Sequence, residues 1–370
     1  MADQPRVLIF RDKLLLPSEG FIPSHYVGFQ NAQPVYLANQ LGWRVDALEA
    51  PRMSMADGAI GRALYKQFGI CAKVGEIAQH GAVAIHAHFG RGGALALPLA
   101  RRLGLPLYVT YHGGDATKKT HSRARLIPSI YQRRLAALQN YASGFLCVSD
   151  FVTARLAAQG FPANKLMTHY IGIDLATMKG PTERGDDAPY LFVGRLVDKK
   201  GVDVMLAALH ALHQSAGKVP PVQIAGTGPQ MDALQSAASG LDNVTFLGWQ
   251  TPEQLAERLA TCRAMIVPSK EAPNGDCEGL PTVVLEAIRA GVPVIASDHA
   301  GIPEIIVDGD TGLLVPEDNV DALAAAIARH MAMAPAEVSA MVARSQAAVR
   351  QRFDAAKQSR RLETILLGGN

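Results

Sequence analysis

The chain has 370 residues, of which 48% are hydrophobic and 19% charged, and its formal net charge is +3. This balance is typical of a folded soluble protein, and the length favours two domains. No stretch approaches the roughly 18 apolar residues that a transmembrane helix needs, and the start of the chain runs directly into a predicted strand instead of a signal peptide. We therefore expect the protein to remain in the cytoplasm.

The first half of the chain alternates predicted strands and helices. Strand-like apolar runs occupy residues 6–10, 43–48, 82–89, 105–112 and 144–149, and helical stretches occupy residues 24–41 (despite Pro34), 93–104 and 131–142. This alternation indicates a parallel, doubly wound sheet. Residues 165–174 close this half, and the segment 179–189, rich in Gly, Pro and charge, is the predicted linker.

The second half repeats this layout with a different sequence. Its predicted strands occupy residues 190–196, 222–226, 243–249, 264–269, 292–297 and 311–315. Its predicted helices occupy residues 201–213, a stretch from 252 onward, 282–290, 319–332, 336–353 and 355–367. The first of these has an apolar face formed by Val202, Met205, Leu206, Leu209 and Leu212. Thr251 and Gln254 form the pattern of a capping box, which predicts a helix start.

Residues 263–304, RAMIVPSKEAPNGDCEGLPTVVLEAIRAGVPVIASDHAGIPE, form the most informative stretch. Two short apolar runs enclose a helix that Pro281 opens and Gly291 ends, which is one crossover unit of a parallel sheet. The Gly-rich loop before this helix lies where unpaired backbone N–H groups attract an anion, most readily a phosphate. Glu278 and Glu286 are eight residues apart, or about 12 Å along a helix.

A nucleoside diphosphate sugar fits that span. Its diphosphate would lie on the helix N-terminus, its sugar hydroxyls near Glu278 and its ribose diol against Glu286, because a carboxylate can accept from two hydroxyls at once. The alternative interpretation is that Glu278 only complements the helix dipole and that Glu286 is a solvated helix position.

The whole segment resembles the signature of the retaining family-4 glycosyltransferases of the GT-B fold: PS, then EG(L)P, a second Glu after seven residues, GxPV(I)AS, AGIPE and G.TG.LV. The resemblance is strong over the second half and weaker over the first. It implies an α/β protein with two doubly wound Rossmann-like domains that face each other across a cleft. The expected domains are an acceptor-binding domain, 1–175, and a nucleotide-sugar-binding domain, 187–352, with a C-terminal helix, 353–370, that packs back on the first.

The resemblance also implies roles for residues outside this segment. Arg195 and Lys200, in GRLVDKKG, would neutralise the diphosphate leaving group, and Lys200 is favoured over Lys199 because it immediately precedes the glycine. The backbone at Gly279 and Leu280 would hold the diphosphate. The residues expected around the base are Gly226, Gly228, Pro268 and the turn 248–250. The alternative for Arg195 and Lys200 is a solvated basic loop.

The first half offers candidates for the acceptor side. In HAHFG and TYHGGDAT, His112 resembles the family position that contacts the transferred sugar, and His86 or His88 would shape the acceptor site; the alternative for each is an ordinary hydrogen-bonded histidine. Gly20 would approach the diphosphate, although many family members carry two adjacent glycines at this turn and this chain has one.

No metal or other cofactor is expected. Three histidines suggest zinc, yet no acidic or cysteine ligand accompanies them at ligand spacing. Asp308 and Asp310 form a literal D-x-D, but IVDGDTG lies between a predicted helix and strand and has the composition of a turn.

The four cysteines, Cys71, Cys147, Cys262 and Cys277, form no C-x-x-C motif. They are therefore interpreted as reduced residues of the core or of loops. Cys277 adjoins Glu278 and is the one that could be accessible, although no neighbour in the sequence would activate its thiol.

The variant YHGGDAT together with PSKEAPNGDCEGLP resembles bacterial exopolysaccharide, capsule or colanic-acid assembly enzymes. The implied donor is a UDP-hexose or GDP-mannose, and the implied acceptor is a saccharide on a polyprenyl diphosphate. Because no side chain is an obvious nucleophile, we expect internal return at the anomeric carbon instead of double displacement. The alternatives are a nucleotide-sugar epimerase, a phosphorylase on the same fold, or a non-catalytic sugar-nucleotide sensor.

Positive charge is concentrated in segment 86–155, where ten basic and two acidic residues give +8, against −5 for the rest of the chain. Each basic residue near an anionic membrane contributes about 1 kcal/mol to binding. We therefore expect the first domain to dock peripherally on the inner face of the cytoplasmic membrane, and we expect no nucleic-acid partner. The residues proposed for docking are Lys118, Lys119, Arg123, Arg125, Arg133 and Arg134. The alternatives are that these residues only keep the surface soluble or that they hold the phosphates of the acceptor.

Overall fold

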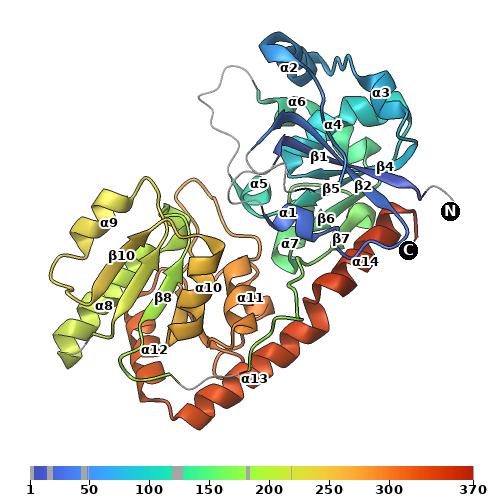
Figure 1. The fold of residues 1–370 in the computed structure, drawn as a ribbon. Coiled ribbons are helices and arrows are strands. Elements are labelled where there is room, and N and C mark those ends of the chain that lie inside the picture. Colours follow the sequence, from blue (N-terminus) through green and yellow to red (C-terminus); the bar gives the residue numbers. More distant parts are fainter. Residues whose placement is uncertain are drawn as a thin grey trace. The chain divides into compact units, whose positions relative to one another are not determined.

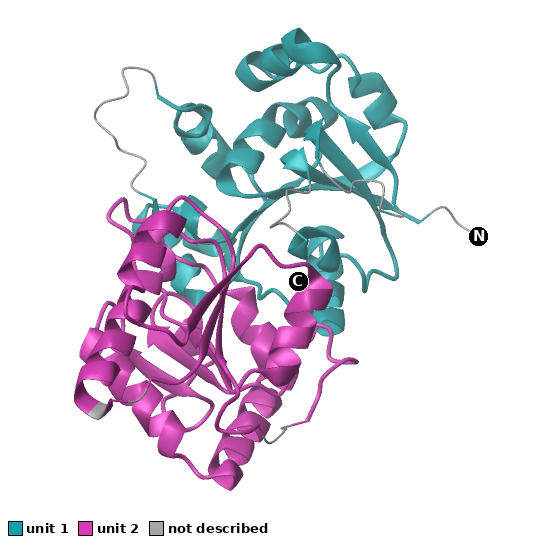
Figure 2. Ribbon diagram, turned by 60° about the vertical axis from the view of Figure 1, so that its left-hand side comes forward, with its two compact units in different colours: residues 1–172, 355–370 teal, residues 173–354 magenta. Residues whose placement is uncertain are grey.

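The computed structural model describes residues 4–14, 20–42, 48, 50–118, 128–180, 184–217 and 219–369. The chain divides into two compact units, coloured teal and magenta in Figure 2. The first unit comprises residues 1–172 and 355–370, and the second comprises residues 173–354. Among the described residues, no helix is both long and apolar enough to cross a bilayer.

The first unit is built on a seven-stranded parallel sheet with strand order β3-β2-β1-β4-β5-β6-β7 (Figure 1). The strands are β1 (Arg6–Leu14), β2 (Gln33–Leu41), β3 (Arg52–Ser54), β4 (Ala82–His88), β5 (Leu107–Tyr111), β6 (Gly144–Cys147) and β7 (Leu166–Thr168). The helices are α1 (Phe21–Ser24), α2 (Gly58–Phe68), α3 (Val74–Ala78), α4 (Gly90–Leu103), α5 (Gly114–Thr117), α6 (Ile130–Tyr141), α7 (Asp150–Ala158) and α14 (Ala355–Leu366).

The helix predicted for residues 24–41 is wrong. Helix α1 ends at Ser24, and β2 begins at Gln33 and pairs in parallel with β1, with Val35 opposite Leu8. The physical reason is local, because Pro34 cannot donate the helical hydrogen bond and the residues after it suit a strand buried on both faces. The strand predicted at 43–48 lies almost wholly outside the described residues.

Helix α14 belongs to the first unit, and hydrogen bonds to one of its carboxylates, which is buried, hold it there. Glu363 is 3% exposed, and its Oε1 accepts the backbone N–H groups of Gln30 (2.9 Å), Asn31 (2.6 Å) and Ala32 (2.8 Å). Apolar residues of α14, including Leu362, pack in the same core as β1. The loop between α1 and β2 is thereby held by the end of the chain.

The second unit is a six-stranded parallel sheet with strand order β10-β9-β8-β11-β12-β13. Its strands are β8 (Tyr190–Val193), β9 (Val222–Ala225), β10 (Val244–Gly248), β11 (Ala264–Val267), β12 (Val294–Asp298) and β13 (Leu313–Pro316). Its helices are α8 (Val202–Ala216), α9 (Met231–Ala237), α10 (Pro252–Thr261), α11 (Thr282–Arg289), α12 (Val320–Ala332) and α13 (Pro335–Arg352).

Local signals in this unit are confirmed. Thr251 and Gln254 form the predicted capping box at the start of α10. The apolar face of α8 is buried in the core of the unit. Strand β8 lies between β9 and β11, so the strand order reverses beside it, and ligands of such sheets bind at the carboxyl ends of the strands next to this point.

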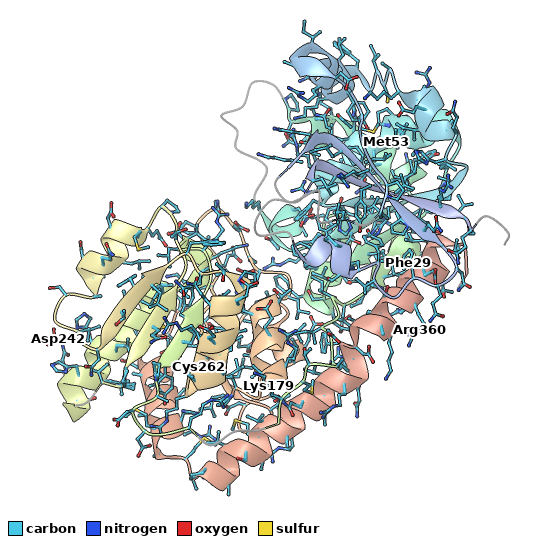
Figure 3. All side chains as sticks on the ribbon, viewed as in Figure 1. Phe29, Met53, Lys179, Asp242, Cys262 and Arg360 are labelled. Carbon is cyan, nitrogen blue, oxygen red and sulfur yellow. The ribbon has the colours of Figure 1, made fainter. Side chains whose placement is uncertain are left out.

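All four cysteines are free and buried. Cys262, labelled in Figure 3, is the C-cap residue that follows α10. Cys277 is 1% exposed, so the expectation that it could be accessible is wrong. Their placement in the core or in loops is confirmed, and their reduced state stays a prediction.

Candidate functional site

Three loops at the carboxyl edge of the second sheet touch backbone to backbone, and glycines make this possible. A Cβ on Gly226, whose φ is +147°, would lie 1.8 Å from the carbonyl oxygen of Gly194, and one on Gly228 would lie 2.2 Å from that of Leu196. A Cβ on Gly201 would lie 1.8 Å from the carbonyl oxygen of Pro268. Close loop packing therefore already explains Gly226 and Gly228, and their contact with a nucleotide stays a prediction.

Helix α11 begins at this edge with its first N–H groups available to an anion. Its N-cap is Pro281, and no described side chain caps it. Gly279 and Leu280, which precede it, are buried, and the carbonyl of Gly279 accepts the N–H of Gly301 at 3.0 Å. The turn is thus fixed by its own backbone, and the positive end of the helix dipole stands free of a side-chain acceptor.

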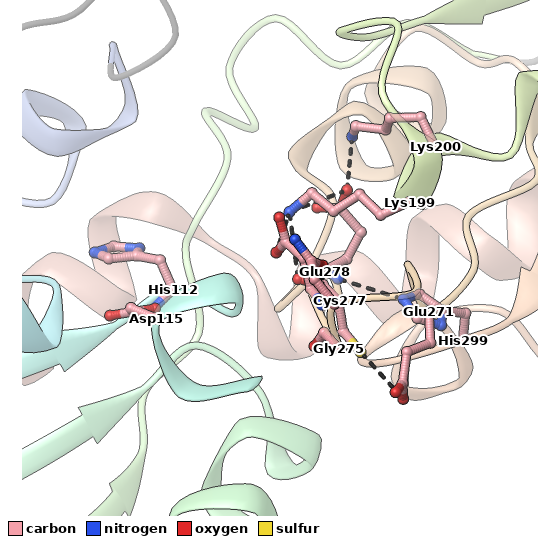
Figure 4. A network of polar contacts seen from close by, with 11 residues as sticks. His112, Asp115, Lys199, Lys200, Glu271, Gly275, Cys277, Glu278 and His299 are labelled. Atoms are coloured by element: carbon pink, nitrogen blue, oxygen red, sulfur yellow. Dashed lines mark hydrogen bonds and ion pairs between the residues drawn. The ribbon is translucent and has the colours of Figure 1, made fainter. Parts of the chain in front are cut away.

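Glu278 lies at the mouth of α11 between two lysines (Figure 4). Its Oε1 is 3.1 Å from Nζ of Lys200 and 3.7 Å from Nζ of Lys199. Burial alone would raise the pKa of Glu278, but the positive charges of Lys200 and Lys199 outweigh it and hold the pKa below its usual value. Glu278 is therefore ionised at neutral pH.

The ammonium groups of the two lysines differ in the number of described contacts that each makes. Lys199 also contacts Asp276 at 3.2 Å and the carbonyl oxygen of Cys277 at 3.3 Å. Lys200 has one described ion-pair partner, Glu278. The sequence analysis considered both lysines, and the structure places both near the carboxylate of Glu278. Lys200 is the closer of the two and has fewer described contacts.

His299 supports the backbone of Glu278 and was missed by the sequence analysis. Its Nε2 accepts the N–H of Glu278 at 3.3 Å, and its Nδ1 bonds to the carboxylate of Glu317. Since the carboxylate needs a donor, Nδ1 carries the proton and Nε2 is left as the acceptor. His299 lies inside the segment that carries the family resemblance, but a single loop histidine has no spacing pattern by which it could be found.

Glu286 lies about one turn into α11, which begins at Thr282. Burial raises the pKa of its carboxyl above the usual value, against the lowering effects of Arg289, a hydrogen bond from Thr282 and the charge of Lys200. Lys200 thus acts electrostatically on both Glu278 and Glu286. Glu286 is therefore not a fully solvated helix position, and its contact with a ribose stays a prediction.

The predicted diphosphate contacts of Arg195 and Gly20 have no supporting observation among the described residues. Arg195 follows β8 with an exposed side chain, and no described acidic residue forms an ion pair with it. A Cβ on Gly20 would meet nothing within 4 Å, so close packing does not require glycine there. Their roles at a diphosphate stay predictions.

The interpretation of IVDGDTG as a turn is confirmed. Gly309 donates its N–H to the carbonyl of Gly312 at 2.8 Å, and the carboxylates of Asp308 and Asp310 pair with Arg329 and Arg344. Among the residues that the structure describes, no group of three His, Cys, Asp or Glu could hold a metal ion.

In the first unit, the three predicted histidines belong to one hydrogen-bonded chain. Nε2 of His86 is 2.7 Å from Oγ1 of Thr110, and Nδ1 of His86 is 2.7 Å from the hydroxyl of Tyr26. The same hydroxyl is 2.6 Å from Nε2 of His88, whose Nδ1 is 3.0 Å from Nε2 of His112. The chain joins β4, β5 and the residues after α1, and no sequence pattern links these positions.

The histidines of this chain are neutral at physiological pH. Burial is the main cause that lowers the pKa of His86, His88 and His112 well below 6.5, and neighbouring positive charge lowers it further. Burial likewise lowers the pKa of the nearby His25 to about 3. His86 and His88 are fully buried, so each would act on an acceptor only through its neighbours.

Asp115 holds the loop that carries His112. Its carboxylate accepts the N–H of His112 and the N–H of Gly90, each at 2.9 Å. The preceding Phe89 has φ of +67°, a strained value for a residue with a side chain, and its ring lies 4.5 Å from that of His112. The loops after β4 and β5 are thereby locked together around His112.

The chain matches two protein-family models. Residues 176–345 match "Glycosyl transferases group 1", and residues 59–177 match "Glycosyltransferase Family 4". The curated relatives include a putative colanic acid biosynthesis glycosyltransferase of Salmonella typhimurium, 28% identical over 76% of this chain and 69% of the relative. The amylovoran biosynthesis glycosyltransferase AmsK of Erwinia amylovora is 31% identical over 75% of this chain and 68% of its own length.

Solved structures agree with this fold. The Anabaena protein HepE, solved with UDP-glucose, superposes with a TM-score of 0.76 at 18% identity and covers 98% of this chain and 99% of its own. The apo form of WaaB, a lipopolysaccharide outer core galactosyltransferase, superposes with a TM-score of 0.70 at 16% identity, with 99% of both chains covered.

Proposed function

Since the chain belongs to the group 1 (family 4) glycosyltransferases and has the GT-B fold, we propose that it moves a hexose from a nucleotide diphosphate sugar to a saccharide hydroxyl during exopolysaccharide synthesis. The observation that carries the proposal is the uncapped start of α11 beside Glu278 and Lys200. A cation lies beside a helix start that no described side chain caps, and a diphosphate would bind at such a place. The relatives named for colanic acid and amylovoran synthesis suggest the pathway class.

In this proposal the second unit binds the donor. The diphosphate lies on the backbone of Gly279 and Leu280, and Lys200 and Arg195 neutralise its charge. Glu286 accepts from the ribose hydroxyls, and Glu278 accepts from the hydroxyls of the transferred hexose. Because Lys200 contacts Glu278 at 3.1 Å, the carboxylate and the diphosphate share one ammonium group, which keeps Lys200 ordered before the donor arrives.

We propose that the reaction retains the anomeric configuration. The bond from the anomeric carbon to the diphosphate breaks first, with its electron pair going to the phosphate oxygen. The acceptor oxygen then attacks from the same face, and a phosphate oxygen of the leaving group takes the acceptor proton. Lys200 and Arg195 stabilise the departing charge, so no metal ion is needed in this scheme.

The donor base and sugar are tested by binding. HepE was solved with UDP-glucose, and a mannosyltransferase of Mycolicibacterium smegmatis, 32% identical over 65% of this chain and 65% of its own, is named as GDP-mannose-dependent. UDP-hexose and GDP-mannose therefore remain equal candidates. A thermal-shift panel of UDP, GDP, ADP and TDP sugars should show stabilisation by one base, and stabilisation by none would contradict the proposal.

We further propose that the acceptor is linked to a polyprenyl diphosphate and that the enzyme docks on an anionic membrane. Arg134 supports this less than the sequence indicated, because its guanidinium donates to the carbonyls of Ala94, Lys66 and Gln67 inside the first unit. Lys119, Arg123 and Arg125 lie outside the described residues. Helix α2 offers a different docking face.

Apolar side chains of α2 point into solvent at a spacing of four residues. Ile60 is 77% exposed, Leu64 39% and Phe68 72%, so all three lie on one face of the helix. Lys66 and Arg62 lie on the same short helix. Both basic residues lie on the opposite side of the helix from this face, and Lys66 pairs with Asp12 at 3.3 Å. The exposed apolar face itself is the feature expected of a helix that lies in a membrane interface.

Vesicle sedimentation tests this face. The double variant Ile60→Glu/Phe68→Glu should lose binding to anionic vesicles, whereas Val307→Glu, which alters a 54% exposed residue of the second unit, should bind as the wild type does. Binding should fade at high salt. Equal binding by wild type and the double variant would refute the proposed face.

A further inference from the structure

The histidine chain of the first unit ends at one nitrogen. It runs from Thr110 through His86, Tyr26 and His88 to His112, and each link is 3.0 Å or shorter. Nδ1 of His112 is buried and has no hydrogen-bond partner among the described residues. This nitrogen is therefore the end of the chain whose hydrogen-bonding capacity no described residue uses.

Proton counting restricts the chain to two arrangements. Each neutral imidazole carries one N–H, and the single phenol proton of Tyr26 can be donated to His86 or to His88 but not to both. If Tyr26 donates to His88, then His88 donates from Nδ1 to His112, and His112 carries its proton on Nδ1. If Tyr26 donates to His86, every bond reverses and Nδ1 of His112 is bare.

Thr110 decides between the two arrangements. In the first, its hydroxyl donates to Nε2 of His86, so its proton is used. In the second, His86 donates to Thr110, and the hydroxyl proton has no other acceptor among the described residues although Thr110 is 1% exposed. A buried donor left without an acceptor is costly, so the first arrangement is favoured.

We propose that Tyr26, with Thr110, His86 and His88, fixes His112 in the Nδ1–H tautomer, so that His112 is an obligate hydrogen-bond donor to an oxygen of a saccharide ligand of the first unit. This inference rests on the proposed function for the identity of the ligand. Tyr26 is then a positioning residue that acts through His88. Because Nδ1 already carries a proton, His112 does not act as the base, and the acceptor proton goes to the leaving diphosphate.

The tautomer can be measured without any reaction. In protein labelled with 15N at histidine, protonated and bare ring nitrogens resonate far apart, and the His112 signals are assigned by their loss in His112→Gln. The wild type should show His112 protonated on Nδ1. Tyr26→Phe and Thr110→Val should each give a mixture of His112 tautomers, whereas Thr110→Ser, which retains the hydroxyl, should match the wild type.

Tyr36→Phe is the matched control, because Tyr36 is a buried tyrosine whose ring lies 6.0 Å from that of Tyr26 without belonging to the chain. It should leave the His112 signals unchanged. If His112 carries its proton on Nε2 in the wild type, or if Tyr26→Phe leaves the tautomer unchanged, the inference is overturned.

Kinetics separate this inference from the proposed function. With an active donor and acceptor pair, Tyr26→Phe should lower kcat about tenfold at constant KM, because the donated bond matters most as charge develops. An Nδ1–H tautomer that depends on Tyr26, in a protein that transfers no sugar, would refute the proposed function and leave the tautomer assignment standing. Sugar transfer by a protein whose His112 is protonated on Nε2 would refute the tautomer assignment and leave the proposed function standing.

Discussion

Replacing Glu278 and Glu286 one at a time by Gln separates the sugar side of the donor from its nucleotide side. If Glu286 accepts from the ribose, Glu286→Gln weakens these charge-assisted hydrogen bonds, each of which contributes about 1.5–3 kcal/mol. Losing one such contribution corresponds to a roughly 10- to 150-fold weaker affinity for the free nucleoside diphosphate. The uncharged, isosteric side chain keeps the helix intact.

Glu278→Gln should act in the opposite direction on the same ligand. At 3.1 Å and an effective dielectric constant of about 20, the gross attraction between Glu278 and Lys200 is about 5 kcal/mol. Solvent screening and burial reduce the net value well below this, but removal of the carboxylate leaves Lys200 with the diphosphate as its partner. Affinity for the nucleoside diphosphate should therefore stay constant or rise up to about tenfold, while sugar transfer falls.

Calorimetric titration of wild type and both variants with the free nucleoside diphosphate measures the difference. Asp276→Gln is a suitable control, because Asp276 pairs with Lys199 and is not assigned to the donor. It should change affinity only slightly. An equal loss of nucleoside diphosphate affinity in Glu278→Gln and Glu286→Gln would refute the division of roles.

Three further predictions concern metal, pH and stability. Activity should survive a strong chelator, and restoration by Mn²⁺ after chelation would direct attention back to Asp308 and Asp310. Because burial raises the pKa of Glu286 and the ribose needs the ionised carboxylate, nucleoside diphosphate affinity should rise with pH through that pKa, and Glu286→Gln should abolish this dependence. Glu363→Ala should lower the free energy of unfolding by about 3–5 kcal/mol, because three N–H groups lose their buried carboxylate acceptor. The control Glu337→Ala removes one exposed cap on α13 and should lower the free energy of unfolding by about 1 kcal/mol or less. Similar losses for the two variants in urea unfolding would contradict this account of α14.

The sequence predicted the second unit well because its signals are local. The start of α10, the apolar face of α8 and the strand–helix–strand unit around α11 each depend on residues within a few positions of one another. The error at residues 24–41 shows the limit of such signals. An apolar stretch buried on both faces has no clear period, and Pro34 was the better guide to its structure.

The site could be predicted only in part, for the same reason. Glu278, Glu286 and Lys200 lie in recognisable motifs. Tyr26, Thr110 and His299 do not, because their partners are 18 to 62 residues away and meet only when the strands are assembled. Sequence analysis treated His86, His88 and His112 as three separate candidates, whereas the sheet order makes them parts of one hydrogen-bonded chain.

The most direct test of the central claim is the release of nucleoside diphosphate from UDP-glucose and from GDP-mannose, measured with and without a polyprenyl-diphosphate-linked saccharide, with NMR of the product bond. The account predicts that one donor releases its nucleotide only when the acceptor is present, and that the new bond keeps the anomeric configuration of the donor. Release at the same rate without acceptor, or a product of inverted configuration, would contradict it.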